Sequence, residues 1–192
     1  MGCCSGGSVE DGFLALRLLA AQKQLGEGAS VHQTGLCRVE CNCAPIPEDK
    51  LPPGAPSGFV YRVSIEHTGT PGSEDPDQLR CFRLSGRHWM LAEEGEEEEE
   101  IVPKNSPGVV GHTPTFGPGD RFVYSSGVTI QGHEATMRGS LQMEWLPPSA
   151  SEAAAAADKR LPGARGGDGE TAKTAADGFD AIIAPFRMVW PS

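Results

Sequence analysis

Residues 59–66 read Phe-Val-Tyr-Arg-Val-Ser-Ile-Glu, and this stretch decides the fold class. A period of two in side-chain character is the signature of a β-strand that buries one face. The buried face would carry Phe59, Tyr61, Val63 and Ile65, and the other face would carry Val60, Arg62, Ser64 and Glu66. The sequence therefore predicts a half-buried strand.

The same period continues on both sides of this strand. Upstream, Cys37, Val39, Cys41 and Cys43 share one face. Further strands are expected at 79–91, 101–102, 121–125, 137–145 and 179–188, with Gly- and Pro-rich turns between them. Pro185 indicates an edge strand or a bulge in the last of these, because proline has no N–H to donate. Short strands without intervening helices predict an all-β fold, an antiparallel β-sandwich.

Two segments fall outside this pattern. Residues 1–33 are expected to be an appendage with a short amphipathic helix over 11–25, which either packs on the domain or lies on a membrane. Residues 147–177 are rich in Ala and Gly and are expected to form a flexible, low-complexity insertion. The sandwich itself is therefore assigned to residues 34–190, in two parts, 34–146 and 178–190.

The acidity of the chain is local. The net charge is −10 for 192 residues, and seven glutamates lie within residues 93–100. This run predicts a solvated acidic loop, with an acidic docking segment as the alternative. The chain has no basic stripe, which argues against a nucleic-acid partner.

The six cysteines are expected to be reduced. No secretory signal precedes them, which favours an intracellular protein in the cytoplasm or nucleus, and no apolar run is long enough to span a membrane. Zinc sites use cysteine pairs on turns, whereas Cys37, Cys41 and Cys43 flank Val39 on one strand face. They are interpreted as small core residues, and neither a metal nor a cofactor is expected.

From residue 108 onward the chain resembles the ApaG family. The matching residues are Gly108-Val109-Val110-Gly111, Pro114, Pro118-Gly119, Phe122, Tyr124, Ser126-Gly127, Met137-x-Gly139, Gln142-Met143, Phe179, Ile183 and Pro185-Phe186, with Leu84 and Arg87-His88-Trp89 upstream. The chain departs from the pattern at Gly86, Pro107 and Leu141. The resemblance implies an immunoglobulin- or fibronectin-III-like sandwich that acts as a binding module without an established enzymatic activity. Eukaryotic domains of this kind are attached to F-box adaptors and to a DNA-polymerase-interacting protein, where they serve protein contacts.

Two candidate binding sites follow. The turn Gly108, Val109, Val110 and Gly111 could bind a phosphate-bearing ligand or another anion through its backbone. It lacks the first glycine and the following helix of a dinucleotide fingerprint, so tight-turn glycines are the simpler explanation. The residues Arg87, His88, Trp89 and Tyr124 could form a protein-interaction patch, because Arg, Trp and Tyr often dominate interfaces. Core packing is the alternative for Trp89 and Tyr124.

The N-terminus carries a candidate lipidation signal, with myristate on Gly2 and palmitate on Cys3 or Cys4. Membrane attachment is expected only if these residues are acylated. No catalytic residues are assigned, and a non-catalytic protein-binding module is the leading hypothesis. A small-ligand or phosphate-binding role is the alternative, and a phosphohydrolase is disfavoured because the sequence lacks a carboxylate-and-histidine metal cluster. The partner's identity and the oligomeric state are not determined by the sequence.

Overall fold

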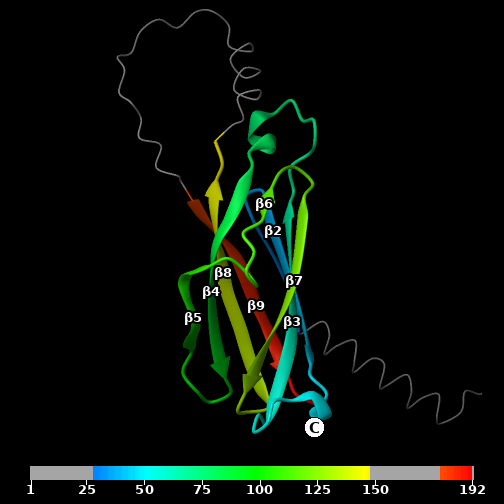
Figure 1. Ribbon diagram of the computed structural model, residues 1–192, viewed down its shortest axis with the longest axis vertical. Coiled ribbons are helices and arrows are strands. Elements are labelled where there is room, and N and C mark those ends of the chain that lie inside the picture. Colours follow the sequence, from blue (N-terminus) through cyan, green and yellow to red (C-terminus); the bar gives the residue numbers. More distant parts are fainter. Residues whose placement is uncertain (1–27, 148–177, 192) are drawn as a thin grey trace, which may run out of the picture.

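The computed structural model describes residues 28–147 and 178–191, which form two antiparallel β-sheets packed face to face (Figure 1). Its strands are β1 (Ala29–Thr34), β2 (Cys37–Pro45), β3 (Ser57–His67), β4 (Phe82–Glu93), β5 (Glu99–Pro107), β6 (Thr115–Phe116), β7 (Arg121–Ile130), β8 (Glu134–Trp145) and β9 (Gly178–Val189). The described helices are two short 3-10 turns, η1 (Glu48–Lys50) and η2 (Pro76–Leu79). The predicted immunoglobulin- or fibronectin-III-like antiparallel sandwich is confirmed.

The strand quoted from the sequence lies inside its sheet. One sheet has the order β1-β2-β3-β7, and the other has the order β5-β4-β8-β9, with β6 paired to the start of β4. In β3, Val63 pairs with Cys41 of β2 and with Tyr124 of β7. Strand β3 therefore has a neighbour on each side.

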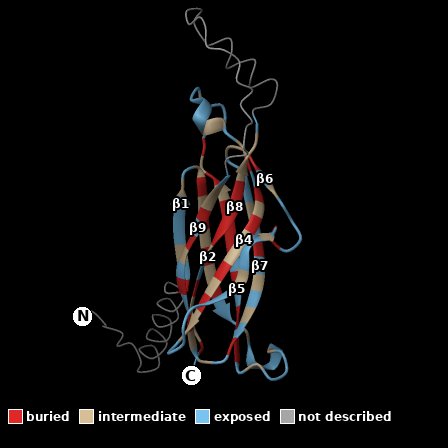
Figure 2. Cartoon of the chain, turned by 90° about the vertical axis from the view of Figure 1, so that its left-hand side faces the viewer, coloured by how far each residue is buried: buried red, intermediate tan, exposed pale blue. Residues whose placement is uncertain are grey.

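The core lies between the two sheets and takes its side chains from the predicted faces (Figure 2). Its largest fully buried members are Trp89, Phe59, Phe82, Phe116, Phe186, Ile65, Leu84, Ile130, Met137, Leu141, Met143 and Ile183. Burial of an aromatic or branched aliphatic side chain of this size contributes about 1.5–3 kcal/mol. The prediction that Cys37 and Cys41 are core residues is confirmed, since both are 0% exposed.

The sandwich begins earlier than the sequence predicted. Residues 29–33, assigned to an appendage, form β1 together with Thr34, and this strand pairs with β2 from Ala29 opposite Asn42 to Thr34 opposite Cys37. The alternation in this strand is weak because four of its six residues are exposed. The boundary at residue 33 is therefore corrected to a start at or before residue 29, and the expected helix over 11–25 lies outside the described residues.

The last strand, β9, is an edge strand with an irregular register, as Pro185 indicated. Its pairing with β8 shifts between Gly139, opposite Ile183, and Met137, opposite Phe186. Strand β1 of the other sheet covers the open side of β9. The Ser30 hydroxyl donates to the Ala184 carbonyl (2.8 Å), and the Ile182 N–H donates to the Thr34 hydroxyl (3.1 Å). Hydrogen bonds between side chains and backbone therefore join the two sheets along the side of the sandwich where β1 and β9 meet.

The acidic run is a strand hairpin rather than one long loop. Strand β4 extends through Glu93 and β5 begins at Glu99, so the run 93–100 contributes to both strands. The Glu93 carboxylate accepts the N–H groups of Gln131 and Gly132, each at 2.9 Å. The expected insertion at 147–177 does separate β8 from β9, although residues 148–177 lie outside the described residues.

Candidate functional site

The Gly108–Gly111 segment is a tight hairpin turn that follows β5. The Val109 N–H donates to the His112 carbonyl (2.9 Å), and the His112 N–H donates to the Val109 carbonyl (2.8 Å). The two central residues, Val110 and Gly111, have φ values of 48° and 78°, which is typical of a turn that reverses two strands in two residues. The interpretation of these glycines as turn formers is confirmed.

Two of the four backbone N–H groups of the Gly108–Gly111 turn already have a backbone acceptor. Besides the pair within the turn, the Gly108 N–H donates to the Ser85 carbonyl at 3.0 Å. Val109 is 0% exposed, so its side chain anchors the turn in the core. Only Val110 and Gly111 retain N–H groups without a backbone acceptor among the described residues. A cradle for phosphate oxygens needs several converging N–H groups, and this turn offers two.

Arg87 attaches the same turn to β4. Its Nη1 donates to the carbonyl oxygens of Pro107 (2.8 Å) and Gly108 (2.5 Å). The guanidinium therefore supplies hydrogen bonds to two carbonyl oxygens of the turn and holds the end of β5 against β4. Arg87 has a structural role, which the sequence did not reveal because the bonded carbonyls lie about twenty residues away.

Trp89 and Tyr124 do not reach the surface, so the four predicted patch residues do not share one face. Trp89 is 1% exposed and Tyr124 is 7% exposed. Trp89 packs against Tyr61 with ring centroids 5.2 Å apart and against Phe186 at 6.2 Å. Core packing, the alternative considered for both residues, is what the structure shows.

The polar atoms of this pair are unusual. Burial raises the pKa of the Tyr124 hydroxyl, and the adjacent Trp89 side chain acts in the opposite direction. Neither Trp89 Nε1 nor Tyr124 Oη has a hydrogen-bond partner among the described residues, although both atoms are buried. Buried polar groups in folded proteins almost always form a hydrogen bond, so these two atoms are exceptions.

His88 and the acidic hairpin are connected by charge. His88 Nε2 lies 2.9 Å from Glu100 Oε1. Arg138 of β8 donates two hydrogen bonds to Glu98, at 2.6 and 2.5 Å, and these bonds lower the pKa of the Glu98 carboxyl. The acidic hairpin is therefore fastened across the outer face of the sheet, and His88 belongs to that fastening.

The cysteine face of β2 is a poor metal site. Burial raises the pKa of Cys37 to about 12, that of Cys41 to about 12 and that of Cys43 to about 11. A metal binds the thiolate, which burial disfavours here. The residues that the structure describes contain no group of three or more His, Cys, Asp or Glu side chains able to hold a metal ion.

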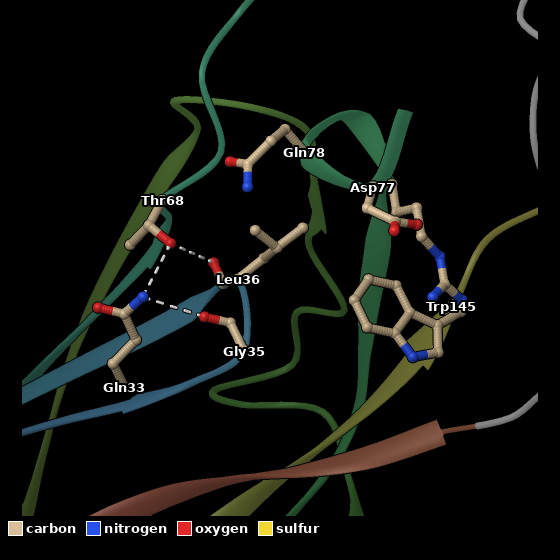
Figure 3. A pocket seen from close by; sticks show the side chains of 8 residues that line it. Gln33, Gly35, Leu36, Thr68, Asp77, Gln78 and Trp145 are labelled. Atoms are coloured by element: carbon tan, nitrogen blue, oxygen red, sulfur yellow. Dashed lines mark hydrogen bonds between the residues drawn. The ribbon is translucent and has the colours of Figure 1, made fainter. Parts of the chain in front are cut away.

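A groove that the sequence did not indicate lies at the end of the sandwich where β1 turns into β2 (Figure 3). Its volume is about 570 Å³, and its lining is Gln33, Gly35, Leu36, Thr68, Asp77, Gln78, Arg80 and Trp145. One wall is polar: Gln33 Nε2 donates to the Gly35 carbonyl (3.0 Å) and to the Thr68 hydroxyl (3.3 Å). Leu36 and Trp145 supply the apolar part.

Arg80 lies at this groove with its charge exposed. Its guanidinium carbon is 4.1 Å from the ring centroid of Trp145, an Arg–Trp stacking distance. The segment that carries Arg80 is fixed by His67, which is 1% exposed. His67 Nδ1 accepts the Gly69 N–H (3.0 Å), so Nε2 carries the proton and donates to the Arg80 carbonyl (2.8 Å). The stack forms between residues 65 positions apart, so no local pattern could have revealed it.

No helix among the described residues has the length and apolar character needed to cross a membrane. Gly2, Cys3 and Cys4 lie outside the described residues, so their acylation stays a prediction.

Comparison with known proteins identifies the family. Residues 50–145 match the family model of the ApaG domain. Protein ApaG of Pseudomonas entomophila strain L48 is 30% identical over 69% of this chain and 74% of its own length, and Protein ApaG of Pseudomonas putida strain W619 is 33% identical over the same shares. The crystal structure of the putative ApaA protein from Bordetella pertussis matches with a TM-score of 0.52, covering 85% of this chain and 95% of that one, at 21% identity. The sandwich, its Gly-rich turn and these matches together show that the chain belongs to the ApaG family.

Proposed function

We propose that this chain is a non-catalytic binding module whose ligand is another protein, contacted through the groove at the end of the sandwich. The observation that carries the proposal is the exposed Arg80 guanidinium stacked on Trp145. Arg and Trp are enriched among the residues that dominate interface energies. Arg80 forms no ion pair with any residue that the structure describes, so its N–H groups are open to an acceptor on a partner.

The chemistry of the groove indicates what the partner presents. One face of the Arg80 guanidinium is covered by Trp145, which leaves the N–H edge for a carboxylate or a backbone carbonyl. The Gln78 amide lies on the same groove, and Leu36 provides an apolar floor (Figure 3). A segment with an acidic side chain next to an apolar one fits this combination.

Two of the five histidines, His67 and His88, support the non-catalytic part of the proposal. Both ring nitrogens of His67 are engaged with backbone groups, and His88 is paired with Glu100. General acid–base catalysis needs a group within reach of a substrate proton, and these rings face structural partners instead.

The test is quantitative affinity capture with the full chain from its native cells, comparing the unsubstituted chain with Arg80→Ala. Arg62→Ala is the matched control, because Arg62 is also an exposed arginine but lies on the outer face of β3. Proteins that depend on the groove should be depleted from the Arg80→Ala sample and retained with Arg62→Ala. Titration of the recovered partner should then show about a tenfold or greater loss of affinity for Arg80→Ala. Equal capture and equal affinity by the two variants contradict the proposed function.

Attachment of this module to a membrane is a second part of the proposal, and it rests on the sequence Met1-Gly2-Cys3-Cys4-Ser5 alone. Two acyl chains anchor a protein stably where one gives only marginal binding. Intact-mass spectrometry of the chain from eukaryotic cells should show added acyl mass that is absent from Gly2→Ala. A mass that matches the unmodified chain in both samples removes this part and leaves the groove proposal unchanged.

A further inference from the structure

A second pocket lies at the end of the sandwich opposite the groove. It has a volume of about 230 Å³ and is lined by Pro45, Ile46, Pro47, Glu48, Trp190 and Pro191. Strand β2 starts next to Leu36 of the groove and ends at Pro45 of this pocket, so the two sites lie at opposite ends of one strand. Five of the six lining residues are apolar, and Trp190 packs edge-on against Phe59 with ring centroids 5.8 Å apart. The pocket therefore offers an apolar surface next to the C-terminal end of the chain, which is marked in Figure 1.

The described chain enters the sandwich beside this pocket. Three contacts with β9 fix its direction: Thr34 bonds Ile182, Ser30 bonds Ala184, and Gly28 lies against the Arg187 carbonyl. Beyond Arg187, β9 leads to Trp190 of the pocket. On the other side of the entering chain, the Cys43 N–H donates to the Gly28 carbonyl (2.9 Å), and β2 continues from Cys43 to Pro45. At Gly28 the chain therefore points back toward both walls of the pocket.

The residues that precede the described chain have the composition to cover an apolar pocket. The sequence predicts a helix over 11–25 with four apolar residues along one side: Leu14, Leu18, Ala21 and Leu25. An isolated helix of this length is marginal in water, so it needs a surface on which to bury that side. Within residues 12–26 the only charged side chains are those of Arg17 and Lys23. The rim of the pocket carries the opposite charge, on Glu48.

We propose that residues 11–25 dock on this pocket as a helix, with the side that carries Leu25 against Ile46 and Trp190. The segment is joined covalently to the strand beside the pocket, so the contact is intramolecular. A short tether holds a segment near its site at an effective concentration of about the millimolar level, so a weak intrinsic affinity is enough to keep the pocket occupied. An external partner would have to displace the segment.

The chain lengths allow this contact. Leu25 precedes Gly28 by three residues, so their Cα atoms lie no more than about 11 Å apart. Pro45 follows Cys43, the residue bonded to Gly28, by two strand residues or about 7 Å. Leu25 therefore reaches the pocket, and Ala21 lies one helical turn before it on the same side.

A lipid surface matches this segment less well. Helices that lie on membranes are rich in lysine and arginine along their polar side. Here Glu10 and Asp11 stand at one end of the segment and Glu27 at the other, which offsets its two basic residues. The groove that carries Arg80 lies at the other end of β2, so the docking of the segment and the proposed partner-binding function stand or fall separately.

The first experiment is hydrogen exchange by mass spectrometry on the full chain without lipid. Residues 14–25 should exchange more slowly than an unstructured chain by about tenfold or more, because docking holds them helical. Leu25→Asp should remove this protection. Leu16→Asp is the matched control, since position 16 lies two and a half helical turns earlier and therefore on the opposite side, and it should retain the protection. Thermal unfolding checks that each variant is folded.

The pocket is tested from its own side with Pro191→Asp. Pro191 is an exposed residue of the lining, so a carboxylate there places charge against the apolar side of the segment and should release residues 14–25. Pro53→Asp is the control, because Pro53 is an exposed proline that does not line the pocket, and it should leave the exchange of residues 14–25 unchanged.

A benzophenone side chain in place of Leu25 locates the contact. Illumination should join it, within one chain, to residues 45–48 or 190–191, and the same label in place of Leu16 should not react there. The proposal is overturned if residues 14–25 exchange as an unstructured chain does, or are protected only when anionic lipid vesicles are added. Protection that either Leu25→Asp or Pro191→Asp leaves intact, equal loss in Leu16→Asp, or crosslinks between two chains also overturns it.

Discussion

At the scale of single residues, Gly139 of β8 is one of the two most constrained glycines among the described residues, with Gly69. A Cβ atom built there would lie 2.1 Å from the His88 carbonyl oxygen and 3.2 Å from the Trp89 ring. Neither neighbour can retreat easily, because His88 and Trp89 belong to the paired strand β4 and Trp89 fills the core. The Met-x-Gly landmark of the sequence thus marks a place where β4 and the ring of Trp89 come too close to β8 for a side chain.

Gly139→Ala should lower the free energy of unfolding by about 1–3 kcal/mol, the usual cost of forcing extra volume into a packed site. Gly132→Ala is the control, because a Cβ at Gly132 would lie 3.6 Å from its nearest neighbour, the Glu93 carboxylate, and the residue has no positive φ. Urea unfolding of both variants measures the difference. Equal stability of the two variants would show that β4 and β8 can move apart at Gly139.

The buried thiols make a second prediction at this scale. Burial raises the pKa of Cys37 and of Cys41 to about 12. A pKa that is higher in the folded state gives a contribution to stability that is full below the unfolded-state pKa, near 9, and is lost as the pH rises toward 12. The stability of the chain should therefore fall between about pH 8 and about pH 10.5, and fall less steeply in Cys41→Val. Urea unfolding at the two pH values tests this, and identical slopes for the two proteins would contradict it.

At the scale of elements, Arg138 ties the acidic hairpin between β4 and β5 to β8. Arg138 donates two hydrogen bonds to Glu98, which lower the pKa of that carboxyl and raise the pKa of Arg138. The pair is solvent-exposed, so its effect on global stability is small. Its consequence is local, because it fixes an acidic segment that would otherwise repel itself.

Arg138→Ala should speed hydrogen exchange in residues 94–100 while leaving the core strands protected. Since the pKa of Glu98 is lowered in the folded state, the contact is fully present above the unfolded-state pKa and is lost as the pH falls through the folded-state pKa. The unsubstituted hairpin should therefore lose protection on acidification, and the Arg138→Ala hairpin should change less. Hydrogen exchange by mass spectrometry at neutral and acidic pH measures both, with Arg62→Ala as the matched surface control. Protection that is the same in all three proteins would show that the hairpin is held by other contacts.

At the scale of the whole molecule, net charge and backbone bonding together disfavour an anionic small ligand. The chain carries a net charge of −10, and the Gly108–Gly111 turn has committed the N–H groups of Gly108 and Val109. Arg87, the nearest cation to that turn, is engaged with its carbonyl oxygens. A polyphosphate would meet a repulsive field and few free donors.

Calorimetric titration of the full chain with ATP or tripolyphosphate should therefore give no saturable heat at millimolar ligand. The titration should be made at low ionic strength, where screening does not hide a weak electrostatic interaction. Saturable binding that Val110→Pro or Gly111→Pro abolishes would instead favour the turn as an anion site.

The sequence by itself determined the strands whose pattern is local. Alternating side chains over 59–66 and 37–43 predicted two β-strands and their buried faces, and Pro185 predicted that the last strand is an edge strand. These features depend only on residues close together in the sequence, because side-chain alternation and the missing proline N–H are local properties of the chain. The tertiary structure decided what depends on distant residues. It placed Trp89 and Tyr124 in the core, added β1 by pairing it with β2, and bound Glu98 to Arg138. It also stacked Arg80 on Trp145, since side-chain contacts across the sandwich are fixed only when both sheets close over one core.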